Sequence, residues 1–114
     1  IKINNMAEII NKTSHDIVIL DQDGIKEIKR IHPSLPPVRI ITSTKDTGTK
    51  INGIVITTTD YQIEGDLPDF EIGTYYVVSA SVKNLLPNRK DLLVPAEVLR
   101  TPQGFIYGCK SLGI

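Results

Sequence analysis

The side chains best suited to chemistry lie in two short polar segments of this chain of 114 residues. The first segment, "NKTSHD", places hydroxyl, amide, imidazole and carboxylate groups together at residues 11–16. Groups of this kind can bind a polar ligand, but they can equally satisfy the backbone of the turn in which they lie. Both interpretations stay open, and we take Thr13, Ser14 and His15 as candidate ligand-binding residues.

The second polar segment lies within "YYVVSASVKNLLPNRKDLLVP", residues 75–95. An apolar, strand-like run passes through Ser79 and Ser81 into a helical pattern, and the free N–H groups of a first helical turn favour anions. Arg89 follows the helix and offers a planar set of donors that matches phosphate or carboxylate. In the alternative interpretation the serines only cap the helix, and Arg89 pairs with Asp91.

Aromatic and basic residues elsewhere extend this candidate site. Tyr75, Tyr76 and Tyr107 are candidates to stack on a base or ribose, and Arg39 and Arg100 are candidates to line a pocket. The ligand that these groups suggest is a small phosphorylated molecule. The predicted ligand-binding residues are Thr13, Ser14, His15, Tyr75, Ser79, Ser81, Arg89 and Arg100.

No catalytic set is assigned. A nucleophilic set could be composed from Ser14 or Ser79 with His15 and Asp91, but the sequence gives no geometry for it. Cys109 lies inside an apolar run and is expected to be a small core residue. The two histidines and the single cysteine lack the spacing of a metal site, so neither a metal nor a cofactor is expected.

Composition narrows the classes of partner and compartment. The 13 basic and 13 acidic residues give a net charge of zero, which argues against an extended nucleic-acid track. Bases prevail over residues 83–110 and acids over residues 60–71, so a basic pocket remains possible. One cysteine cannot form an intrachain disulfide, which favours a reducing, cytoplasmic setting. No long apolar run predicts a membrane span.

Short β-branched runs separated by turns predict one mainly β domain over residues 1–114, at the margin of the α+β class. We expect a small barrel-like or folded antiparallel sheet of about seven strands, because closure would protect the strand edges. A polar turn is expected over residues 46–50, and a bend at Gly53 in the next strand. The expected elements are strands over 16–21, 25–31, 38–45, 51–65, 74–78, 92–99 and 105–112, and a short helix near 80–86.

Two blocks of the sequence resemble a family of small, largely uncharacterised bacterial and phage proteins. "NKTSHDIVILDQDG" is similar to an Asn-Leu-Thr-Pro-His start that is followed by an apolar strand and an acidic turn, with Ser14 in place of the usual proline. Residues 64–112 are similar to the family's Gly-Thr-x-Tyr, Arg-x-Asp-Leu and terminal Gly-Cys patterns. Residues 25–60 match weakly. The resemblance indicates membership of the family and carries almost no information on function.

In profile the chain also resembles the small cytosolic proteins by which phages sequester nucleotide immune signals, such as the cyclic ADP-ribose isomers of Thoeris systems. We therefore expect a non-enzymatic protein, and a candidate homo-oligomer, that binds a cyclic ADP-ribose-type molecule or a cyclic dinucleotide in the host cytoplasm. One alternative is a protein-interaction module that uses the acidic loop from Glu64 to Glu71 or an exposed strand edge. A weaker alternative is a hydrolase of a nucleotide signal.

Overall fold

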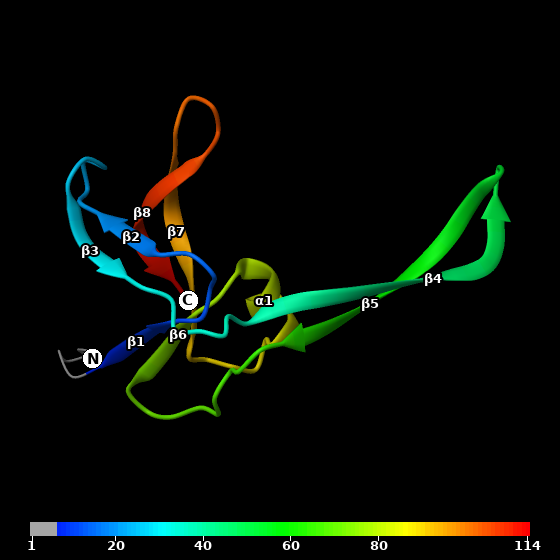
Figure 1. Cartoon of the computed structure of the whole chain (residues 1–114), viewed down its shortest axis with the longest axis horizontal. Coiled ribbons are helices and arrows are strands. Elements are labelled where there is room, and N and C mark those ends of the chain that lie inside the picture. The colour runs from blue at the N-terminus through cyan, green and yellow to red at the C-terminus, as the bar shows by residue number, and fades with distance from the viewer. Residues whose placement is uncertain (1–6) are drawn as a thin grey trace.

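The computed structural model describes residues 7–114 and shows a body of short strands from which one long hairpin projects (Figure 1). Over the described residues the protein is mainly β with one short helix, as predicted. The elements are β1 (Glu8–Asn11), β2 (Ile17–Leu20), β3 (Glu27–Ile31), β4 (Arg39–Ile51), β5 (Ile54–Glu64), β6 (Thr74–Val77), α1 (Ala80–Leu85), β7 (Leu92–Arg100) and β8 (Ile106–Gly113).

Six of these strands form the body, and their arrangement corrects the expected barrel-like or antiparallel sheet. The order is β1-β6-β7-β8-β2-β3, while β4 and β5 form a separate two-stranded sheet. Three neighbouring pairs are parallel: β1 with β6, β6 with β7, and β2 with β8. Parallel neighbours require crossover connections, and α1 lies in the one between β6 and β7. Within residues 7–114 the two sheets do not close into a barrel.

The core lies on both faces of β6, because successive side chains of a strand point to opposite faces. Tyr76 and Val78 pack on one side in a cluster that includes Leu92. Val77 packs on the other side with Cys109. Val77, Val78 and Leu92 have no exposed surface, so the middle of the sheet is its best-protected part.

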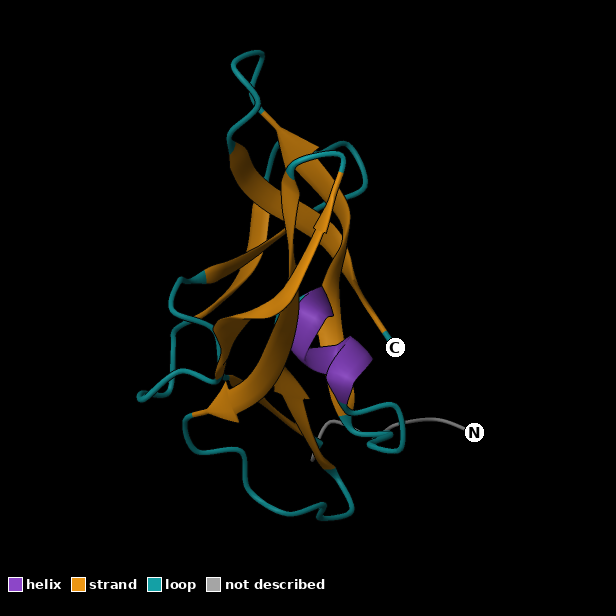
Figure 2. Cartoon of the chain, turned by 90° about the vertical axis from the view of Figure 1, so that its right-hand side faces the viewer, coloured by secondary structure: helices purple, strands orange, loops and turns teal. Residues whose placement is uncertain are grey.

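The helix α1 begins where the sequence predicts it and lies beside the strands of the main sheet (Figure 2). The Ser79 side chain caps it by accepting a 3.2 Å hydrogen bond from the backbone N–H of Val82. Val82 is fully buried and Leu86 packs against the same cluster, but Leu85 is 40% exposed. The apolar face of the helix is therefore narrower than its sequence spacing predicts.

Strands β4 and β5 form the projecting hairpin, which we call the arm, and its turn does not lie where we predicted it. The expected turn over residues 46–50 is instead a bulge within β4, and the chain reverses at Asn52-Gly53. Asn52 has φ +50° and Gly53 has φ +77°. Two successive residues in this left-handed region match the right-handed twist of a tight hairpin, and Asn-Gly adopts them at low cost.

The arm joins the body through a narrow root. Ile40 and Ile63 face each other across the two strands, and both pack against the core cluster of Val78 and Leu92. Gly65 ends the returning strand at φ +109°, and a Cβ atom there would collide with the carbonyl oxygen of Pro37. Only glycine allows these two segments of the chain to pass this closely.

Candidate ligand-binding groove

One groove of about 1100 Å³ lies where the arm meets the body. Its walls come from the β1–β2 connection, β2, the arm root, the β6–α1 junction, and strands β7 and β8. Ile17, Val38, Val78 and Cys109 are buried residues of its lining and give it an apolar floor. Its polar lining includes five of the predicted ligand-binding residues: Thr13, Ser14, His15, Ser79 and Ser81.

Asn11 shapes the polar end of the groove, and we did not single it out in the sequence. Its side chain is 1% exposed and its Nδ2 donates to the backbone oxygens of His15 at 2.7 Å and Ile31 at 3.0 Å. Its Oδ1 accepts from the backbone N–H and the hydroxyl of Thr13 at 2.9 and 2.6 Å. Thr13 is therefore committed to the turn, while the side chains of Ser14 and His15 lie at an exposed rim.

The two serines at the β6–α1 junction differ in the hydrogen bonding of their hydroxyl groups. Ser79 has its hydroxyl engaged by the helix cap, as the capping interpretation requires. Ser81 lies in the first turn of α1 and is exposed on the groove. Of this pair, Ser81 is thus the better placed to bind a ligand.

An ion cluster lies at the edge of the groove. Arg30 contacts Asp16 at 3.0 Å and Glu27 at 2.8 Å, and the Nδ1 atom of His32 lies 2.9 Å from an Asp16 oxygen. Hydrogen bonds from His32 and then Arg30 lower the pKa of Asp16. Hydrogen bonds to Glu27 and Asp16 raise the pKa of Arg30. Arg30 therefore lines the groove with its charge already compensated by two carboxylates.

Arg39 is the less constrained cation of the groove. It lies at the arm root, its side chain is 66% exposed, and its Nε is 3.8 Å from a Glu64 carboxylate oxygen. A surface ion pair at this distance contributes little free energy, so Arg39 can exchange Glu64 for a bound anion. Tyr107, which is 48% exposed, also lines the groove and adds an aromatic ring.

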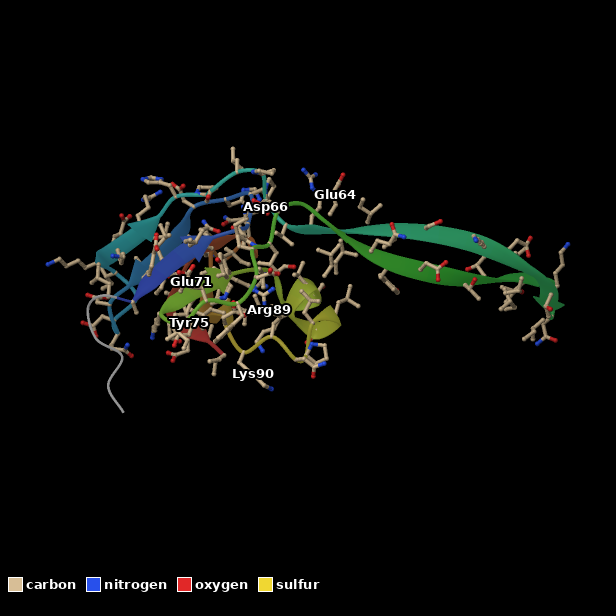
Figure 3. The ribbon with its side chains drawn as sticks, turned by 90° about the horizontal axis from the view of Figure 1, so that it is seen from below. Glu64, Asp66, Glu71, Tyr75, Arg89 and Lys90 are labelled. Atoms are coloured by element: carbon tan, nitrogen blue, oxygen red, sulfur yellow. The ribbon has the colours of Figure 1, made fainter. Side chains whose placement is uncertain are left out.

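The remaining predicted residues lie outside the groove lining. Tyr75 is half-buried on β6, and Figure 3 places it with Arg89 and Lys90 on the underside of the body. Arg89 donates from Nε and Nη2 to Asp91 at 2.9 and 2.8 Å, and from Nη2 to the Pro68 oxygen at 2.8 Å. Arg100 donates to the Gly104 oxygen at 3.0 Å in the β7–β8 turn.

These contacts separate Asp91 from the other members of the candidate nucleophilic set. Asp91 is 1% exposed, bound by Arg89 and outside the lining that holds Ser14, Ser79 and His15. Burial raises the pKa of the Cys109 thiol, which opposes formation of a thiolate nucleophile.

Comparisons with models of protein families, with curated proteins and with solved structures find no match to this chain. Two further findings concern residues 7–114. No helix there is long and apolar enough to cross a membrane. No group of three or more His, Cys, Asp and Glu side chains in this range is placed to hold a metal ion.

Proposed function

We propose that this chain is a non-enzymatic binding protein for a small, nucleotide-derived anion. The observation that supports it most is the convergence of two polar segments, 13–16 and 79–81, on one groove. More than sixty residues separate them in the sequence, and each contains groups that hydrogen-bond to phosphate or ribose. The groove volume of about 1100 Å³ is slightly above the range of about 300–1,000 Å³ that is typical of small-molecule sites.

The lining suggests how such a ligand would lie. The guanidinium of Arg39 pairs with a phosphate, and Ser81 and His15 donate hydrogen bonds to phosphate or ribose oxygens. The ring of Tyr107 offers a face on which a base can stack. Cyclic ADP-ribose isomers and cyclic dinucleotides combine these phosphate, ribose and base groups. More specifically, we propose that this chain is a phage protein that sequesters such a signal in the host cytoplasm.

Binding without turnover is proposed because the described residues that line the groove do not assemble a nucleophilic set. A serine nucleophile needs a histidine base that a third group orients. The candidate orienting residue, Asp91, is instead held by Arg89. Among the described residues, His32 contacts the carboxylate of Asp16, but Arg30 binds the same carboxylate. A hydrolase of a nucleotide signal is therefore the weaker alternative.

Titration calorimetry against cyclic ADP-ribose isomers and cyclic dinucleotides tests this function. We expect one of these ligands to bind and to be recovered chemically unchanged. Arg39→Met should weaken binding about tenfold, because the ligand phosphate loses its charged partner. Arg100→Met is the matched control, since Arg100 is exposed and lies outside the groove, and it should leave the affinity unchanged.

Two outcomes would reject the proposal. One is that no cyclic ADP-ribose isomer and no cyclic dinucleotide gives a measurable heat of binding. The other is recovery of a cleaved ligand, which would favour the hydrolase, provided that His15→Ala abolishes the turnover.

A protein-interaction module is the second candidate function, and the arm is the observation that favours it. The arm exposes Ile41, Ile51, Ile54, Val55 and Tyr61 to solvent. Co-purification of a different protein in fixed stoichiometry would support this candidate.

A further inference from the structure

The arm is the part of the molecule that the proposed ligand site does not explain. Strand β4 has 13 residues and β5 has 11, and beyond the root nearly all of them are exposed. Thirteen residues of strand span about 43 Å, and the longest dimension of the protein is 55 Å. The radius of gyration, 17.7 Å, exceeds the ~13 Å of a compact domain of similar length, because the arm extends away from the body.

An isolated two-stranded hairpin is only marginally stable in water. The tip of this arm is nonetheless apolar: Ile51 and Ile54 face each other and are 57% and 65% exposed, and Val55 is 47% exposed. Both strand edges lack proline, so their backbone groups are open to a further chain. These features are typical of a segment that is covered in an assembly.

The distribution of charge indicates that the arm can bind a second arm. Its outer half, residues 45–50, contains two lysines and one aspartate. The chain that returns to the body at its root, residues 60–66, contains three acids and no base, and Arg39 on the opposite strand pairs with one of these acids, Glu64. Figure 3 places Glu64 and Asp66 at this root. A second arm running in the opposite direction brings each lysine-bearing half beside the acidic root of the other copy.

The receptor for the apolar tip lies at the same root. Apolar side chains are exposed there: Leu85 of α1, which packs beside β4, is 40% exposed, and Leu35, in the loop that leads into β4, is 70% exposed. A two-fold axis across the middle of the arm places the tip of each copy at the root of the other. The arrangement closes on itself, as most homo-oligomers do. The arm is also large enough, because a stable interface uses about 20–30 residues from each partner.

We infer that two copies of this chain form a dimer by reciprocal arm exchange, each arm lying antiparallel to the other with its apolar tip at the root of the partner's arm. The inference goes beyond the proposed function and does not depend on the identity of the ligand. It is tested with ligand-free protein, so its failure is distinguishable from a failure of ligand binding.

Sedimentation equilibrium of the full chain tests the dimer. The wild-type protein should be dimeric, and added salt should weaken the dimer by screening the charge pairs. Ile54→Asp should raise the dimer dissociation constant at least about tenfold, because a charge replaces an apolar side chain that the partner covers. Ile25→Asp is the matched control: Ile25 is 84% exposed and lies outside the arm, so dimerisation should be unchanged.

A distance measurement separates arm exchange from other dimers. Spin labels on Thr49→Cys should be about 25–30 Å apart in the dimer, because antiparallel arms place the two labels on opposite sides of the two-fold axis, each about four residues of strand from it. The native Cys109 is 2% exposed and therefore protected from labelling. A monomeric wild-type protein, equal dissociation constants for Ile54→Asp and Ile25→Asp, or a short tip-to-tip distance would each overturn the inference.

Discussion

Replacing Asn11 by leucine is expected to lower the free energy of unfolding by about 3 kcal/mol, although the two side chains are similar in size. The amide makes four hydrogen bonds, and leucine would leave the backbone oxygens of His15 and Ile31 without this donor. Each buried polar group that loses its partner costs about 1–3 kcal/mol. Urea unfolding of the wild-type protein and Asn11→Leu measures the difference.

The same substitution should weaken ligand binding, because the turn that carries Ser14 and His15 would lose its fixed geometry. Asn84→Leu is the matched control: Asn84 is exposed on α1, so its replacement should change stability by less than ~0.5 kcal/mol. If Asn11→Leu were as stable as this control, Asn11 would not organise the groove.

Replacing Arg89 by methionine is expected to lower the free energy of unfolding by about 3 kcal/mol at neutral pH. Asp91 is 1% exposed, and the guanidinium of Arg89 holds its pKa below the usual range through their hydrogen bonds. Removing Arg89 leaves a buried carboxylate without its counter-charge, which is among the costlier single changes in a protein. Arg100→Met, at an exposed position, should stay within ~0.5 kcal/mol of the wild type.

The pH dependence of this effect has a definite sign. In the wild-type protein the lowered pKa of Asp91 contributes stability above the unfolded-state pKa of about 4, and this contribution is lost as the pH falls through the folded-state value. In Arg89→Met, Asp91 no longer has that contribution, so the two proteins should converge in stability as the pH falls below about 4. The double variant Arg89→Met/Asp91→Leu should recover most of the loss at pH 7. A difference between wild type and Arg89→Met that is constant with pH would contradict this account.

The local sequence predicts most elements of the fold, because their signals are local. Alternating and β-branched runs locate the strands from β2 to β8 within a few residues, except for the end of β4, and Ser79 fixes the start of α1. The hairpin turn was missed because Asp46–Lys50 is rich in polar residues, whereas the decisive signal is Asn52-Gly53, whose backbone conformation matches a tight turn. Strand order could not be predicted, because the parallel pairing of β2 with β8 depends on contacts between residues far apart in the sequence.

Only part of the lining of the candidate groove can be predicted from the sequence, because some of its signals are local and others depend on contacts between distant residues. Clustered hydroxyl and imidazole groups identify Ser14, His15 and Ser81 as ligand candidates, and the fold brings them to one groove. The signal for Asn11 was present in its spacing from Thr13, since an asparagine often binds the backbone two residues on. Its hydrogen bond to the Ile31 oxygen of β3 was not visible in the sequence. The pairing of Arg89 with Asp91 was one of two open interpretations, and its burial arises from the surrounding fold.

The most direct measurement of the central claim is amide chemical-shift mapping by NMR during titration with cyclic ADP-ribose isomers and cyclic dinucleotides. The ligand that binds should shift the amides of residues 13–16, 79–81 and 106–109, which come together only in the groove. Residues 75, 89 and 100 lie outside it and should shift little. Shifts confined to those three positions and their neighbours, or no shifts with any of these ligands, would contradict the account.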